Sequence, residues 1–96
     1  MDARALKREA VRRGYFYDAV TQDWTLYEEG ATHAIAVWVS RSCEIGWAVY
    51  GPDPRFGFWS QIKTGQAETL ERAERCARES MRNIVLAFDT RTSHNR

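Results

Sequence analysis

Cysteine, proline and histidine are scarce in this 96-residue sequence, which has two of each. Two cysteines are too few for a scaffold built on disulfides. The cysteines and histidines also stand alone, whereas the ligands of a zinc site cluster at spacings of about two to five residues. We therefore expect no structural disulfide, no metal and no cofactor. Cys43 is expected to be an exposed thiol in a loop, and Cys76 a small side chain on the apolar side of a helix.

Long apolar runs are absent as well. No stretch approaches the roughly 20 residues that a membrane-spanning helix needs. We expect no secretory leader, because the chain does not start with a basic and then an apolar segment. The sequence has 44% hydrophobic and 28% charged residues, as an ordinary globular protein has, and the length of one domain. A net charge of +1 weakens the case for non-specific nucleic-acid binding. These features predict a single cytoplasmic α+β domain.

Acidic charge and aromatic side chains gather in the middle of the sequence. Residues 15–60 hold six acidic and two basic side chains, a net charge of −4, between flanks of +3 and +2. Aromatic residues make up 12% of the chain, which is more than one side of a small sheet encloses. A large bare aromatic patch is rare on a monomer, so the surplus should lie under the N-terminal segment, in a homodimer interface or against a partner.

The N-terminal part of the sequence predicts a short helix followed by an ambiguous segment. Asp2–Arg13 is expected to be a helix that Asp2 caps and Gly14 ends. Tyr15–Val20 fits a helix and a strand equally well. Trp24–Glu28 alternates apolar and polar residues, which favours a strand.

Two β-rich runs, His33–Ser40 and Ile45–Tyr50, predict a hairpin. One face of this pair carries isoleucines, valines and Trp47, and the other carries small residues with Trp38 and Tyr50. If branched residues lie opposite one another across the two strands, the sequence numbers of each pair must add up to an even number. This register implies a loop of three or five residues and excludes a two-residue turn.

The C-terminal half predicts a turn, a short strand, a long helix and a tail. Gly51–Pro54 should form a stiff turn, and Phe56–Trp59 a short edge strand. Apolar side chains recur every three or four residues over Leu70–Phe88, which indicates an amphipathic helix. Residues 89–96 should form a disordered tail. The helix residues expected to face the sheet are Leu70, Ala73, Ala77, Met81 and Ile84.

The elements together predict an α+β fold. A three- or four-stranded antiparallel sheet should pack its Ile/Val face on the C-terminal amphipathic helix, with a short N-terminal helix beside them. No catalytic site is predicted. His33 could pair with Glu28 or Glu29, but no serine or cysteine nucleophile motif accompanies it, so a histidine with a structural role is favoured. We therefore expect that the chain is not an enzyme.

Two patterns are similar to nucleic-acid-binding families. Arg55–Trp59 resembles the RNP1 motif of RNA-recognition and cold-shock domains, in which ring faces stack on bases. It lacks the glycine that should follow the basic residue, and the surrounding segment is acidic. The order helix, three strands, helix is similar to a double-stranded-RNA-binding domain, but Glu68 and Glu71 stand where that family has phosphate-binding lysines. The alternative function is therefore a small RNA- or single-stranded-nucleic-acid-binding domain with an aromatic sheet face.

A further resemblance covers residues 32–86. A strand pair carrying Trp-x-Val-Tyr (Trp47–Tyr50) precedes a turn and a helix that opens Thr-Leu-Glu-x-Ala (Thr69–Ala73). This pattern is similar to small β-sheet-plus-helix proteins of phages and mobile elements, of the anti-CRISPR-like kind. The resemblance implies an inhibitor in the cytoplasm of a bacterial host cell, which binds and blocks a host defence complex without catalysis.

The predicted partner surface lies on the sheet face that points away from the long helix. Trp38 and Tyr50 should project from it, because the alanines and glycine around them are too small to hide two large rings. Arg55, Phe58 and Trp59 are expected to extend this face. Aromatic and arginine side chains dominate the hot spots of protein interfaces. We predict a non-catalytic protein-binding module with a flat face that meets a protein partner or a second copy, unless the N-terminal helix covers it.

Overall fold

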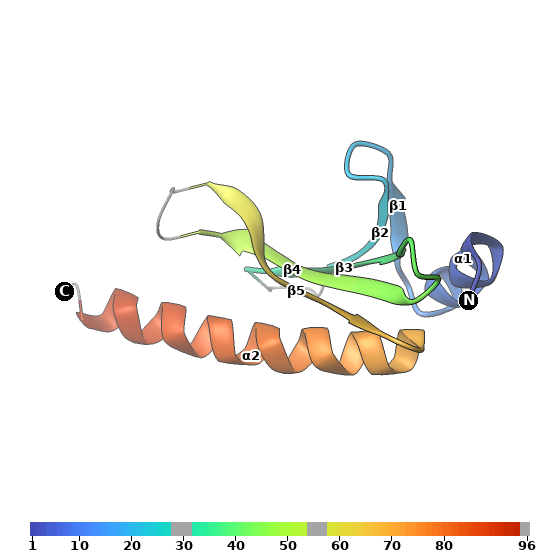
Figure 1. Cartoon of the computed structure of the whole chain (residues 1–96). Coiled ribbons are helices and arrows are strands. Elements are labelled where there is room, and N and C mark those ends of the chain that lie inside the picture. The colour runs from blue at the N-terminus through green and yellow to red at the C-terminus, as the bar shows by residue number, and fades with distance from the viewer. Residues whose placement is uncertain (28–31, 54–57, 95–96) are drawn as a thin grey trace.

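A computed structural model describes residues 1–27, 32–53 and 58–94 of the chain. Its elements are α1 (Ala3–Arg12), β1 (Phe16–Asp18), β2 (Asp23–Tyr27), β3 (Ala34–Val39), β4 (Ile45–Pro52), β5 (Trp59–Ala67) and α2 (Leu70–His94). The strands form one antiparallel sheet in the order β1-β2-β3-β4-β5. α2 runs along one face of the sheet, while the β1–β2 hairpin and the start of β5 curl away from it (Figure 1). The predicted α+β fold is confirmed.

α1 begins and ends where the sequence predicts. The Asp2 side chain accepts a hydrogen bond of 2.8 Å from the backbone N–H of Ala5, which caps the first turn. Gly14 follows the last turn with a φ of +90°, a left-handed conformation that glycine adopts without strain. Leu6 and Ala10 are buried. The ambiguous segment after this helix forms strand β1.

The β3–β4 hairpin has the predicted register. Val37 lies opposite Trp47, and the numbers of all paired residues have an even sum. Five residues separate the last pair, Val39 and Ile45, which is one of the two predicted loop lengths. This register gives the hairpin one face of branched side chains and one face of small ones.

The last strand differs from the prediction in position and length. β5 starts at Trp59 and continues for nine residues, whereas the sequence predicts a short strand over Phe56–Trp59; residues 54–57 lie outside the described part of the chain. Gly51 and Pro52 extend β4 instead of forming the expected turn. β5 is a largely polar edge strand, so it lacks the apolar pattern that identifies a buried strand. With β1, it brings the strands among the described residues to five, against the three or four predicted.

A β-bulge in β5 determines which face its first residues occupy. The register shifts between Val49 and Tyr50. Tyr50 pairs with Gln61, which leaves Ile62 as an extra residue in β5. Because side chains alternate between the two faces of a sheet, the extra residue moves Gln61 and Trp59 onto the face that carries Tyr50. In an unbroken ladder both would lie on the face that α2 covers.

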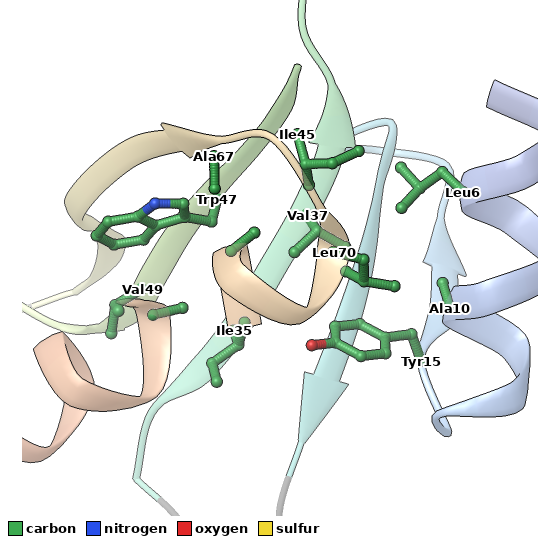
Figure 2. Close-up of a cluster of buried hydrophobic side chains, with 12 residues drawn as sticks. Leu6, Ala10, Tyr15, Ile35, Val37, Ile45, Trp47, Val49, Ala67 and Leu70 are labelled. Carbon is green, nitrogen blue, oxygen red and sulfur yellow. The ribbon is translucent and has the colours of Figure 1, made fainter. Parts of the chain in front are cut away.

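The hydrophobic core lies between the sheet and α2, with α1 at one end (Figure 2). The indole of Trp47 lies against Gly65 of β5, where a Cβ atom would collide with it. The α2 residues predicted to face the sheet do so, with three buried and two half-buried against the core: Leu70, Ala73 and Ala77, then Met81 and Ile84. The sheet contributes Ile35, Val37, Ile45, Trp47 and Val49. The predicted packing of the Ile/Val face on α2 is therefore confirmed.

α2 begins as predicted and is longer than predicted. The Thr69 hydroxyl accepts a hydrogen bond of 3.2 Å from the N–H of Arg72, which caps the first turn. The helical backbone continues to His94 instead of ending at Phe88, so the predicted disordered tail from residue 89 is wrong as far as His94. The physical reason is that this stretch holds neither glycine nor proline to stop the helix.

A cluster of polar side chains connects the segment after α1 to α2 by a hydrogen bond and ion pairs. Tyr15 is buried and donates its hydroxyl to Oε1 of Glu74 at 2.7 Å. Nη1 of Arg13 lies 3.2 Å from the other oxygen of Glu74, and Nε of Arg78 lies 3.7 Å from it. Burial, and then the hydrogen bond to Glu74, raises the pKa of Tyr15 far above its ordinary value. Tyr15 therefore remains a neutral donor over the whole physiological pH range.

The packing of α2 predicts unequal effects of two substitutions on stability. Leu70→Ala removes a buried side chain from the core, and we expect it to lower the free energy of unfolding by about 2–5 kcal/mol. Arg75→Ala changes an exposed residue whose ion pair with Glu71 is itself exposed, so the unfolding midpoint should hardly move. Urea denaturation followed by circular dichroism measures both. Equal losses of stability would show that the orientation of α2 is wrong.

The two cysteines should differ in reactivity. Cys43 is exposed in the β3–β4 loop, whereas Cys76 is half-buried on α2 and packs against the core. A thiol reagent should therefore modify Cys43 rapidly in the folded protein and Cys76 much more slowly, until denaturant exposes it. Mass spectrometry of the peptides at successive times resolves the two sites. Equal rates under native conditions would contradict the packing of Cys76.

Candidate functional site

The sheet face opposite α2 has a floor of small side chains. Ala34, Ala36 and Ala48 lie on it, and all three are buried. Gly46 leaves room for the indole of Trp38, which would collide with a Cβ atom at that position. The sequence predicts a flat, open face here with Trp38 and Tyr50 projecting from it. Both rings are half-buried instead, and the face is concave.

Two aromatic side chains show how strongly the sheet curves. Tyr27 belongs to β2 and Trp59 to β5, yet their ring centroids are 5.8 Å apart. β3 and β4 lie between these strands, so in a flat sheet the strands that carry the rings would be about 14 Å apart. The β1–β2 hairpin and the start of β5 both rise on the side of the sheet away from α2 (Figure 1), and the contact of Tyr27 with Trp59 shows that the sheet curves over the floor.

An aromatic rim, which we define as Phe16, Tyr27 and Trp59, lies on these walls. Phe16 stacks on Tyr27 with ring centroids 5.5 Å apart and planes 15° apart. The three side chains are 47%, 51% and 46% exposed. Phe58, the neighbour of Trp59 in the chain, is 61% exposed. The rim thus presents apolar surface of the kind that partners cover.

An acidic hollow opens on the same face. Its larger part has a volume of about 540 Å³ and its smaller part about 80 Å³, and Thr21, Asp23 and Tyr50 line both parts. Trp38 and Gln61 also line the larger part, which lies where β2 separates from β3. Among the described residues that line either part there is no lysine, arginine or histidine.

Asp23 is the most buried charged group of the acidic hollow. It is 4% exposed, and its Oδ1 accepts hydrogen bonds from the hydroxyls of Thr21 (2.8 Å) and Thr25 (2.9 Å). Its Oδ2 accepts no hydrogen bond from any residue that the structure describes. Asp18 lies directly opposite in β1 and lines the smaller part. Two carboxylates therefore face the hollow together.

The phenol of Tyr50 reports the electrostatic environment of this hollow. Burial raises its pKa above the ordinary value of 10.0, and the negative charges of Asp23 and then Asp18 raise it further. Burial and the two carboxylates therefore disfavour a negative charge on Tyr50.

The predicted site residues are partly brought together. Trp38 and Tyr50 line the larger part of the hollow, and Tyr50 and Trp59 line the smaller part. Phe58 is exposed next to Trp59. Arg55 lies outside the described residues.

α1, one of the covers considered for the surplus aromatic residues, borders this face but leaves the aromatic rim exposed: Ala3 and Leu6 line the larger part of the hollow. Leu6 and Ala10 also join the core beside Leu70 (Figure 2). The rings of the aromatic rim remain about half exposed beside the hollow.

His33 directly precedes β3. It is buried, its ring lies against Gly51, and its Nδ1 is 2.7 Å from the hydroxyl of Thr32. Glu28 and Glu29, the carboxylates considered as its partners, lie outside the described residues.

The sequence analysis missed the contribution of β1 and β2. The alternation of β2 places Asp23, Thr25 and Tyr27 on the face opposite its apolar residues, and this signal was present in the sequence. The sequence did not identify Phe16 and Asp18 as site residues, because their segment fitted a helix as well as a strand. Neither residue could be assigned to a face before its strand was known.

The described residues hold no group of three or more histidine, cysteine, aspartate or glutamate side chains placed to bind a metal ion. Both cysteines are free thiols. No helix in this part of the chain is long and apolar enough to cross a membrane.

The raised pKa of Tyr50 gives a pH-dependent prediction. The neutral phenol is favoured in the folded state, so Tyr50 contributes stability that is complete below pH 10 and is lost as pH rises through its folded-state pKa. Asp23→Asn removes a nearby negative charge and should lower the pKa of Tyr50, whereas Glu79→Gln on the exposed side of α2 should leave it unchanged. Titration of the tyrosine Cζ resonances by NMR measures this. An unchanged pKa in Asp23→Asn would show that Asp23 does not act on Tyr50.

The sequence matches no protein-family model, and neither a curated protein nor a solved structure is significantly similar to it.

Proposed function

We propose that this chain is a non-catalytic protein-binding module whose partner covers the aromatic rim. The observation that carries the proposal is the exposure of three contacting rings, Phe16, Tyr27 and Trp59, on one concave face. Covering these rings would remove apolar surface from water, which is the main driving force of association. Aromatic side chains also supply much of the binding energy in protein interfaces.

The charge of the concave face supports a protein partner over a nucleic acid. Stacked rings alone would also suit exposed bases. However, Asp18 and Asp23 face the hollow beside the rim, and the described lining offers no basic side chain to a phosphate. Affinity for nucleic acid rests largely on neutralising phosphates, which this face opposes.

We further propose that the module is an inhibitor that a phage or mobile element encodes, and that it binds and blocks a protein complex of the host. A protein that inhibits by blocking a surface of its target needs a stable fold and one binding surface. The core between the sheet and α2 stabilises the fold, and the aromatic rim is the proposed binding surface.

Truncation of the rim tests the proposal. The double variant Phe16→Ala/Trp59→Ala should weaken binding to a partner captured from bacterial lysate at least about 30-fold, the effect of losing one hot-spot ring. Its unfolding midpoint should change little, because both rings are about half exposed. Calorimetry with the captured partner and thermal melts measure the two quantities.

Val11→Ala is the matched control. Val11 is an exposed apolar residue on α1 that does not belong to the rim, and its truncation should affect neither binding nor stability. Retention of the partner by the double variant would refute the proposed surface, as would a collapse of its stability. Sedimentation at several concentrations distinguishes a second copy as the partner. Binding to an oligonucleotide that falls steeply with salt would favour the nucleic-acid alternative.

A further inference from the structure

We propose that the acidic hollow binds the cationic end of a basic side chain, preferentially the guanidinium of an arginine, that a protein partner presents. The inference rests on the proposed function, because hollow and rim belong to the same concave face and the smaller part of the hollow reaches Trp59 of the rim. The inference adds that the partner must present a positively charged side chain to the hollow.

The first argument is the burial of Asp23. A carboxylate withdrawn from water is costly unless a cation or several hydrogen bonds compensate it. The threonine hydroxyls of Thr21 and Thr25 both reach Oδ1, and both hydrogen bonds fix the carboxylate in place. Oδ2 is left without a hydrogen bond from the described residues, and Asp23 lines both parts of the hollow. The site thus holds a rigid acceptor that is available to a donor from outside.

The second argument is the absence of an internal cation from the described lining. Asp18 adds a second carboxylate, and its Oδ1 accepts hydrogen bonds from the N–H groups of Val20 (2.9 Å) and Thr21 (3.4 Å), which fix its position. Buried carboxylates in proteins are generally paired with basic groups. Here the lining supplies two acidic groups and no basic one, so a ligand would have to bring the positive charge.

The third argument is the aromatic wall of the hollow. Trp38 and Tyr50 line its larger part, and Tyr27, Tyr50 and Trp59 line its smaller part. The faces of such rings attract cations, and a planar guanidinium also stacks on them. A ring-lined site with carboxylates binds an organic cation better than a neutral ligand of the same shape.

The size of the hollow favours a side chain over a bare ion. A volume of about 540 Å³ falls in the range of sites for small organic groups. Gln61 adds an amide to the polar lining, so that several polar groups face the larger part. Arginine, with five N–H donors on a flat group, can use the carboxylates and the rings at once.

The test compares three probes on the isotope-labelled wild-type protein by NMR titration. An Ala-Ala-Arg-Ala-Ala peptide with blocked ends should shift the indole resonance of Trp38 and the amide resonances of Thr21 and Asp23. The same peptide with citrulline, which is neutral and of the same shape, should bind at least about tenfold more weakly. Agmatine, a free amine with the same guanidinium, should bind no more tightly than the arginine peptide.

Two variants, each of which removes one negative charge, test whether the arginine peptide binds in the hollow. Asp23→Asn keeps an oxygen for the threonine hydroxyls and removes the negative charge, so it should weaken arginine-peptide binding at least about tenfold. Glu79→Gln, on the exposed side of α2, should leave the binding unchanged. Equal binding of the arginine and citrulline peptides to the wild type would overturn the inference without reference to any variant.

Failure of this inference is distinguishable from failure of the proposed function. If the arginine peptide does not bind while Phe16→Ala/Trp59→Ala still loses the partner, the cation site is refuted and the protein-binding face stands. Tighter binding of agmatine than of the peptide would refute a protein source of the cation and assign the hollow to a free amine.

Discussion

The concave face depends on one extra residue in β5. The bulge at Ile62 moves Trp59 and Gln61 from the side of α2 to the side of Tyr50. Bulges also increase the local twist of a strand, and the start of β5 curls away from α2 (Figure 1). Without the bulge, Trp59 could not meet Tyr27 across two intervening strands, and the rim would be incomplete.

The two faces of the sheet differ in their side chains: one forms the core, and the other carries the proposed binding surface. The face toward α2 carries branched side chains and Trp47, which fill the core. The opposite face carries alanines and Gly46, whose small size lets Trp38 lie against the strand and leaves room for the hollow above the floor. Because the core packs on the first face, side chains on the second can expose rings and carboxylates without loss of the fold.

Charge and ring placement act together on the concave face. Asp18 and Asp23 lie opposite each other in β1 and β2, and the rings of β2, β4 and β5 surround them. Burial raises the pKa of Tyr50, and the negative charges of Asp23 and Asp18 raise it further. For the proposed binding function, this combination would select a partner by charge as well as by shape.

Local patterns in the sequence were sufficient for the elements whose partners are near in the chain. The alternation in β3 and β4 determined their register and their faces, the spacing of Leu70, Ala73 and Ala77 determined the buried side of α2, and the capping residues determined where both helices begin. The same alternation correctly separated Trp38 and Tyr50 from the core.

The curvature, the bulge and the hollow were decided by the tertiary structure alone. β5 is polar and lies at an edge, so its pairing carries no apolar signature, and a shift of one residue is invisible until the partner strand is known. The contact between Tyr27 and Trp59 joins residues 32 positions apart on two strands that are not neighbours in the sheet. Such contacts arise from the closure of the sheet in space, which periodicity along the chain does not encode.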